Sequence, residues 1–165
     1  MGILEQYDAL NATLWSVSDL DSDEKQIWLM ADSLLDGAEY TQTVVEEGNR
    51  ILNAQPFPWQ EIAEALNVRS ESDQESRQLL LKVLNTITLV KEEDRARFHS
   101  EFEHLWLQGA SRYRLVGPRG VFSDKRDIRI IDRQTDREIT VSPDYMHLAA
   151  VRLMMVHGVL VEQIE

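Results

Sequence analysis

Residues 27–52 read IWLMADSLLDGAEYTQTVVEEGNRIL, a stretch with a clear helical pattern. Small and apolar residues recur along it at alternating steps of four and three: Ile27, Ala31, Leu34, Ala38, Thr41, Val45, Gly48 and Leu52. This spacing is typical of one face of a long helix. Further apolar residues widen the face, which favours a helical bundle over an isolated coiled coil. We expect one helix over residues 23–54, ended by Pro56 and Pro58.

Two more helices are expected after this one, a short helix at 59–66 and a long one at 74–108. Pro58 suits the first turn of the short helix, and Asn67 is a candidate left-handed cap at its end. Residues 91–97 are almost all charged, which indicates a bend or break in the long helix, and Gly109 marks its end. The small residue Gly48 on the first long helix would let a neighbouring helix approach closely.

Short β-branched runs with polar turns between them follow at residues 113–116, 128–131 and 139–141. This pattern predicts a small antiparallel meander. A last helix is expected to open at 142–144. Its predicted apolar face consists of Met146, Ala149, Leu153, Val156, Leu160 and Ile164.

The predicted fold is therefore mainly α (α+β), a helical bundle with two long helices and a small antiparallel β-meander inserted before the C-terminal helix. Three parts of one compact domain are expected. They are an acidic helical bundle at 1–110, a basic β-meander at 111–142, and a C-terminal helix at 143–165 that packs back on the bundle.

The composition is acidic, with 29 Asp and Glu against 17 Lys and Arg, a net charge of −12 over 165 residues. Residues 1–70 carry −10 of this charge, whereas residues 111–137 carry +4. The balance argues against a general nucleic-acid coat protein, whose affinity comes from cations. The absence of cysteine excludes disulfides, thiolate zinc sites and thiol catalysis.

The beginning of the sequence carries Glu5 and Asp8, where a signal peptide would have basic residues followed by an apolar stretch. No apolar run approaches the roughly 18 residues that a membrane-spanning helix needs. We therefore expect a cytoplasmic protein that does not use a membrane.

Residues 58–68 read PWQEIAEALNV, and their Ile-Ala-x-x-Leu-x-Val pattern resembles the first helix and turn of a bacterial helix-turn-helix. The resemblance covers residues 58–81 and implies that a second helix would lie in the major groove of DNA. The chain departs from the family pattern at Asp73 and Ser76, where an apolar packing residue is expected. Glu71, Asp73 and Glu75 in the candidate recognition segment would also repel phosphates.

The basic residues of the meander form a second candidate site, because arginine can bind phosphate or carboxylate with two parallel bonds. Strand alternation places Arg114, Arg129 and Arg137 on the exposed face. One interpretation is a partner-binding or anion-binding surface, including a wing on DNA. The other is that the basic sheet pairs with the acidic helices of its own chain or of a second copy. The candidate residues are Arg112, Arg114, Arg119, Arg126, Arg129, Arg133 and Arg137.

Aromatic anchors and metal ligands complete the candidates. Trp15, Trp28 and Trp59 fit apolar contacts with a partner. An acid stands three residues before a histidine at Glu101 and His104 and again at Asp144 and His147, a spacing that di-iron bundles use. A metal-dependent helical enzyme with Glu101, His104 and His147 as ligands is thus a third hypothesis. Our expectation is no metal, no other cofactor and no catalytic residue.

The function expected from these observations is that of a non-enzymatic regulator, adaptor or inhibitor. It would act by binding another protein with a basic surface, because an acidic surface attracts and steers such a partner. The heptad-type helix and the apolar C-terminal helix also predict a homodimer. The alternative is a DNA-binding transcriptional regulator that uses residues 58–81 together with a basic hairpin at 112–137.

Overall fold

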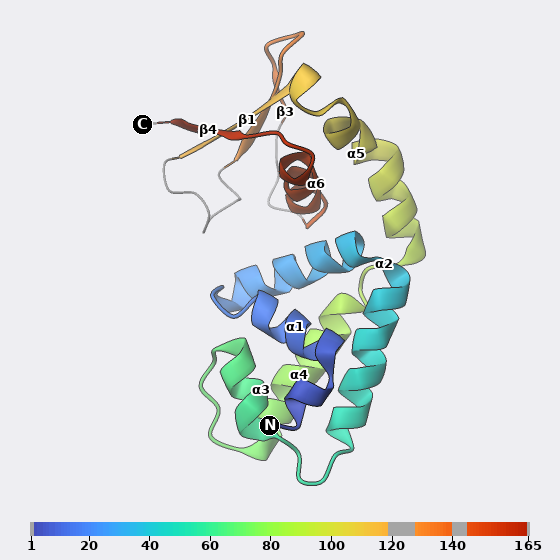
Figure 1. The fold of residues 1–165 in the computed structure, drawn as a ribbon, viewed down its shortest axis with the longest axis vertical. Coiled ribbons are helices and arrows are strands. Elements are labelled where there is room, and N and C mark those ends of the chain that lie inside the picture. Colours follow the sequence, from blue (N-terminus) through green and yellow to red (C-terminus); the bar gives the residue numbers. More distant parts are fainter. Residues whose placement is uncertain (1, 119–127, 140–144, 165) are drawn as a thin grey trace. The chain divides into compact units, whose positions relative to one another are not determined.

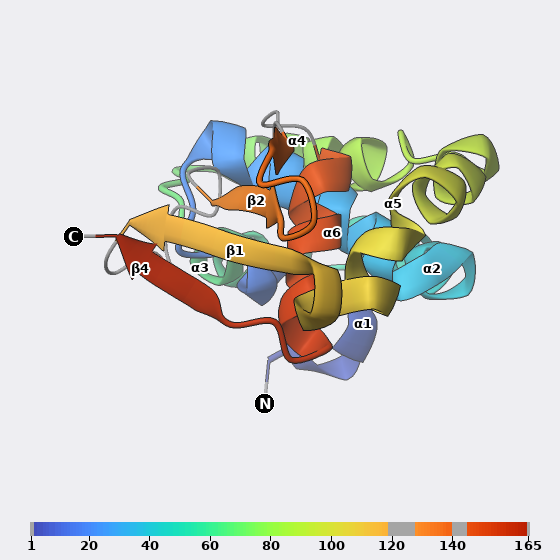
Figure 2. The ribbon, with the colours of Figure 1, turned by 90° about the horizontal axis from the view of Figure 1, so that it is seen from above.

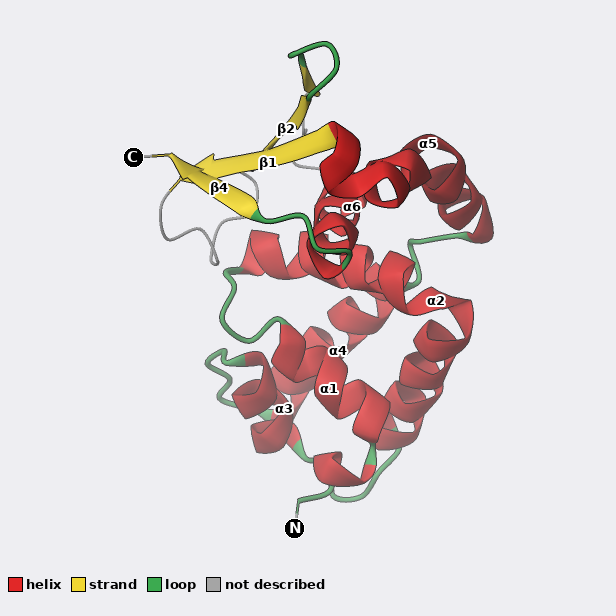
Figure 3. Cartoon of the chain, turned by 45° about the horizontal axis from the view of Figure 1, so that its top comes forward, coloured by secondary structure: helices red, strands yellow, loops and turns green. Residues whose placement is uncertain are grey.

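The computed structural model describes residues 2–118, 128–139 and 145–164. Contacts divide the chain into two compact units, Met1–Glu92 and Glu93–Glu165. Within the described residues, the first unit is built of helices and all strands belong to the second, as Figure 3 shows. The predicted mainly α class with a small sheet is confirmed.

The first unit opens with a 3-10 helix, η1, and continues through four α-helices. Their bounds are η1 (Leu4–Gln6), α1 (Asp8–Ser16), α2 (Ser22–Leu52), α3 (Trp59–Leu66) and α4 (Asp73–Ile87). Side-chain caps explain two of the starts. The Asp21 carboxylate accepts the Glu24 N–H at 2.9 Å, and Ser72 Oγ accepts the Glu75 N–H at 3.1 Å.

The long helix α2 is interrupted at Gly37, so the prediction of one regular helix over 23–54 is wrong there. Gly37 has φ 85° and ψ 171°, a conformation that is essentially confined to glycine. The ribbon of α2 changes direction part-way along its length (Figure 1). Three bonds fasten the break: Thr41 Oγ1 donates to the Gly37 carbonyl (2.9 Å), Ser33 Oγ contacts Thr41 Oγ1 (3.1 Å) and Ser33 donates to the Ile87 carbonyl (3.1 Å).

Beyond the break, the buried face of α2 agrees in part with the predicted one. Beyond Gly37 the buried positions are Thr41, Val44, Gly48 and Ile51, which follow one another at helical steps. The predicted face named Val45 and Leu52 in this half, and both are only half-buried, whereas Ala38 is exposed. The predicted stripe is thus right at Thr41 and Gly48, and the deepest burial lies one residue earlier than Val45 and Leu52.

Carboxylates from other helices satisfy the starts of η1 and α1. Neither helix has a side-chain cap of its own. Glu61 of α3 accepts the Ile3 N–H at 3.3 Å, and Glu47 of α2 accepts the Leu10 N–H at 2.7 Å. These bonds place the N-terminal segment on α2 and α3, where Leu10 is fully buried.

Helix α3 ends as predicted at a left-handed Asn67, with φ 55°. The Val68 N–H donates to the Ala63 carbonyl at 3.0 Å, which is the bond pattern of a Schellman motif. The expectation that Gly48 admits a neighbouring helix is also confirmed. A Cβ atom at Gly48 would lie 2.6 Å from both δ-carbons of Leu84 on α4.

The predicted helix over 74–108 consists of two helices. Helix α4 ends at Ile87 and α5 (Glu92–Arg112) begins at Glu92, so the expected break lies just before the charged stretch 91–97. Gly109, with φ 46° and ψ −136°, interrupts α5 where the sequence predicts its end, and the helix assignment continues to Arg112. Most of α5 clusters with the sheet in the second unit.

The second unit contains a four-stranded mixed sheet with the strand order β3-β2-β1-β4. Its strands are β1 (Tyr113–Pro118), β2 (Arg129–Asp132), β3 (Glu138–Ile139) and β4 (Val161–Ile164). The first three pair antiparallel in chain order, which confirms the predicted meander. Strand β4 pairs parallel to β1 on its other side, as Figure 2 shows.

Helix α6 (Tyr145–Val156) stops earlier than predicted, and the expected apolar face through Leu160 and Ile164 is wrong at that end. Gly158 takes φ 95°, and the Val159 N–H donates to the Met154 carbonyl at 3.0 Å. This second Schellman motif turns the chain out of the helix. The β-branched residues that follow then form β4 rather than another helical turn.

The positive φ at Gly37 leads to a stability prediction. Gly37→Ala should lower the free energy of unfolding by about 1–3 kcal/mol, because an alanine Cβ is strained in that backbone conformation. Urea unfolding followed by circular dichroism measures the change, with the exposed Glu39→Ala as the control. A Gly37→Ala variant as stable as the parent would mean that α2 does not need its break.

Candidate partner-binding site

The two units differ sharply in charge. Residues 1–92 hold 17 Asp and Glu against six Lys and Arg, a net charge of −11. Residues 93–165 hold 12 against 11, a net charge of −1. The helical unit therefore carries nearly all of the negative charge, and the unit with the sheet is close to neutral.

The arginines of the sheet are engaged by acids of the sheet itself. Arg114 forms a forked pair with Glu162, with Nε at 3.2 and 3.0 Å from the two carboxylate oxygens. Arg133 approaches the same carboxylate at 4.0 Å. The other pairs are Arg112 with Asp132 at 3.1 Å and Arg129 with Glu138 at 3.6 Å. In these four pairs the acids belong to the same unit as the arginines, on the sheet strands β2, β3 and β4.

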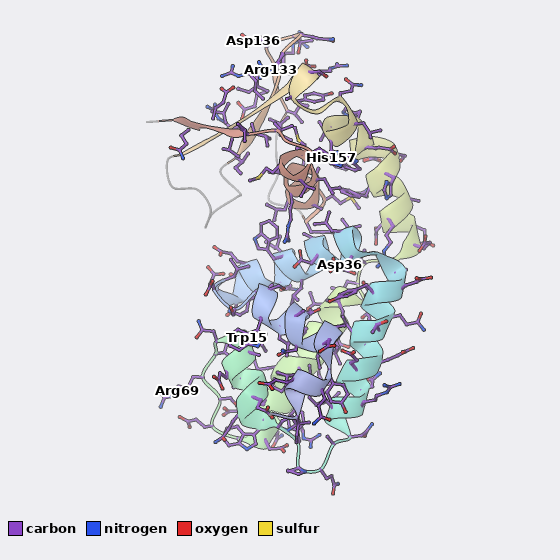
Figure 4. The ribbon with its side chains drawn as sticks, viewed as in Figure 1. Trp15, Asp36, Arg69, Arg133, Asp136 and His157 are labelled. Carbon is purple, nitrogen blue, oxygen red and sulfur yellow. The ribbon has the colours of Figure 1, made fainter. Side chains whose placement is uncertain are left out.

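The predicted arginines also differ in where they lie. Arg114 and Arg129 lie on the same face of the sheet, as strand alternation predicted. Arg137 is exposed beside β3. Arg119 and Arg126 lie outside the described residues. Figure 4 shows Arg133 and Asp136 at the turn between β2 and β3.

The ion pairs shift the carboxyl groups toward their charged form. The hydrogen bond from Arg114 is the main cause that lowers the pKa of Glu162, and the hydrogen bond from Arg112 likewise lowers the pKa of Asp132. Since Glu162 belongs to β4 and Arg114 to β1, the first pair joins two neighbouring strands that are far apart in the sequence. The Arg114 guanidinium is therefore engaged by a carboxylate of the protein itself.

A pH dependence follows from the lowered pKa values of Glu162 and Asp132. A group whose pKa is lower in the folded state stabilises the fold above its ordinary pKa and loses this contribution as the pH falls. The free energy of unfolding should therefore decrease between about pH 5 and pH 3. Glu162→Gln and Asp132→Asn should each flatten this profile in urea unfolding. Identical profiles for the parent and both variants would contradict the assignment.

The segment that resembles a helix-turn-helix does form two helices, α3 and α4, joined by residues 67–72. Ser76, which stands where that family has an apolar packing residue, is completely buried. Its hydroxyl donates to the Trp59 carbonyl at 2.7 Å and contacts Ser70 Oγ at 2.8 Å. A polar bond thus fastens α4 to α3 at this point.

The surface of this segment is unsuited to phosphates. Asp73, Gln74 and Glu75 are exposed at the start of α4. Arg77 turns back to donate to the Leu52 carbonyl at 2.8 Å, with its guanidinium 4.2 Å above the Phe57 ring. Affinity for DNA needs cations that face the phosphates. The surface of this segment therefore supports DNA binding less than its sequence pattern does.

An open groove lies beside α3, with a volume of about 590 Å³. It is lined by residues 54–61 together with Asp73 and Arg77 of α4. This volume is in the range of ligand-binding clefts. Sequence reasoning missed the groove, although the run Pro56-Phe57-Pro58-Trp59 could have signalled a rigid aromatic segment between two helices.

The three candidate tryptophans differ in exposure. Trp15 on α1 is 48% exposed, whereas Trp28 is only 8% exposed. Trp59 is half-buried and lines the groove. Figure 4 labels Trp15 on the first unit. Trp15 and Trp59 thus present apolar surface that a partner can contact, and Trp28 does not.

Tyr40 is an exposed aromatic residue on α2 that sequence reasoning missed. Its hydroxyl lies 3.5 Å from the Ala9 carbonyl on α1. Partial burial, followed by the negative charge of Asp36, raises the pKa of Tyr40. Glu47 and Asp32 add to the same negative field. An aromatic side chain among carboxylates is a feature that suits a cationic or apolar contact.

The candidate metal ligands have other neighbours. Glu101 lies 3.8 Å from Arg97, and the His104 ring meets Tyr113 edge-on at 5.9 Å. The His147 ring meets Phe102 edge-on at 4.9 Å. In the described parts of the chain, no three His, Asp or Glu side chains are grouped so that they could hold a metal ion. Asp144 lies outside these parts.

Among the described residues, no helix has the length and apolar character needed to cross a membrane. Comparison with protein-family models finds no match, and no curated protein or solved structure matches the chain.

Proposed function

We propose that the chain is a non-enzymatic regulator, adaptor or inhibitor that binds another protein with a basic surface. The observation that carries this proposal is the division of charge, with −11 on residues 1–92 and −1 on residues 93–165. A concentrated negative field attracts a basic partner and speeds its encounter. We also propose a cytoplasmic location, because of the sequence composition. The homodimer expected from the sequence stays a prediction.

The pairing within the sheet supports the choice of the helical unit as the binding surface. Arg112, Arg114 and Arg129 already have carboxylate partners in the second unit. The acids of α2 are more numerous than its bases, and several of them are exposed. An exposed Trp15 and Tyr40 on the same unit add aromatic surface of the kind that dominates protein interfaces.

Capture of the partner at two salt concentrations tests the proposal. Neutralising three exposed acids, with Asp36→Asn, Glu39→Gln and Glu46→Gln, should weaken the complex about tenfold at about 50 mM salt, because each exposed charge contributes about 0.5 kcal/mol. The parent complex should weaken between about 50 and 500 mM salt, because ions screen exposed charges. Surface plasmon resonance with the captured partner measures both effects.

The matched control removes the same charge from the other unit, with Glu93→Gln, Glu101→Gln and Asp136→Asn. This variant should bind nearly as tightly as the parent. Equal weakening by both triple variants would reduce the effect to net charge alone and contradict a helical binding surface. A complex that is insensitive to salt, or one that nuclease treatment dissolves, would overturn the proposal and favour the DNA-binding alternative.

A further inference from the structure

We infer that the groove lined by residues 54–61, Asp73 and Arg77 is the place where an arginine or lysine side chain of the partner inserts. This inference rests on the proposed function and names the contact within it. The groove combines a cavity of about 590 Å³ with carboxylates and aromatic side chains on the acidic unit. A surface cleft of this size accommodates one or two side chains of an extended segment.

The walls of the groove are held in place before any ligand arrives. Arg77 is fixed at three points, by the Leu52 carbonyl, the Phe57 ring and the carboxylate of Asp73. Phe57 is itself only 5% exposed. A site whose side chains are already ordered loses less entropy when it binds. The groove is therefore preorganised on its α4 side.

Glu61 of the groove lining is positioned by the N-terminal segment. Its Oε2 accepts the Ile3 N–H at 3.3 Å. Gly2 packs so closely that an added Cβ atom would overlap Glu61 Oε1. The carboxylate is thus held at the lining of the groove by backbone contacts of the N-terminal segment.

The charges of the lining favour a cation over an anion. The charged residues of the lining are Glu61, Asp73 and Arg77, and because Asp73 and Arg77 pair with each other, Glu61 gives the lining a net negative charge. An entering carboxylate or phosphate would meet the like charge of Glu61 and the field of a unit with net charge −11. An entering guanidinium or ammonium would meet the opposite sign.

The aromatic lining favours arginine in particular. Trp59 is half-buried, lines the groove and stands two residues before Glu61 in the chain. A guanidinium stacks on an aromatic face while it bonds to a carboxylate, and the stem of the side chain packs on apolar surface. The same groove already holds one such arrangement, in which Arg77 lies over Phe57.

The test titrates the full chain, at about 50 mM salt, with a capped peptide of sequence Gly-Ser-Arg-Leu-Arg-Ser-Gly and with its counterpart that has glutamate in place of both arginines. Two-dimensional nitrogen–proton NMR records which amides shift and gives the dissociation constant. We expect the arginine peptide to shift the amides of residues 54, 55, 57 and 59–61 and the Trp59 indole. The glutamate peptide should leave them unchanged.

Two pairs of variants locate the contact. Glu61→Gln should weaken binding about fivefold, the factor for one unit charge at about 4 Å in water. Glu64→Gln, on the exposed side of the same helix, should change it less than about twofold, because exposed charges contribute little. Gln60→Lys places a repelling cation in the groove without touching Glu61, and should weaken binding more than Gln78→Lys on the exposed face of α4.

The outcomes separate this inference from the proposed function. Equal effects within each pair, or amide shifts spread over α2, would reject the groove as the binding site. The proposed binding of a basic partner by the acidic surface would still stand. Shifts of the groove by the glutamate peptide would overturn it in favour of an anion site at Arg77. If the arginine peptide does not bind while the partner is still captured in a salt-dependent way, the groove is rejected as the binding site and the proposed function is not.

Discussion

The first unit depends on a small buried group of polar atoms, the Ser33 and Thr41 hydroxyls and the Ile87 carbonyl. These atoms satisfy one another where α2 is broken, and Ser33 is only 4% exposed. Since a buried hydroxyl without a partner costs about 1–3 kcal/mol, the two halves of α2 and the end of α4 are fixed together. The acids on both halves of α2 are thereby held at definite places on the surface.

Local signals predicted the elements whose cause lies within a few residues. Such local elements are the left-handed Asn67, the start of α3 after Pro58 and the polar turn between β2 and β3. Each depends only on residues that are neighbours in the sequence. The break at Gly37 was missed because a glycine among residues at heptad spacing does not disturb the pattern of its neighbours. Its positive φ is supported by Ser33, Thr41 and the distant Ile87, which no local pattern connects.

The candidate site was harder to predict because its decisive contacts are distant in sequence. Arg114 and Glu162 are separated by 48 residues and meet only because β4 pairs parallel to β1. Charge counting found the basic segment but could not show that Arg112, Arg114, Arg129 and Arg133 approach carboxylates of their own unit. In the same way, the groove brings together the loop after α2 and the first turns of α4, with Asp73 and Arg77 on the latter.

The carboxylates of Glu47 and Glu61 have a consequence for how the unit carries its charge. Each is bonded to a backbone amide at the start of a short helix, where the helix dipole is positive. One carboxylate of α2 and one of α3 therefore serve to dock residues 3–16 on these helices. Loss of that segment would strip two acids of their amide donors and uncover the apolar surface under Leu10 and Leu14. Backbone amides of the N-terminal segment thus stabilise two carboxylates of the acidic unit without adding a positive charge to it.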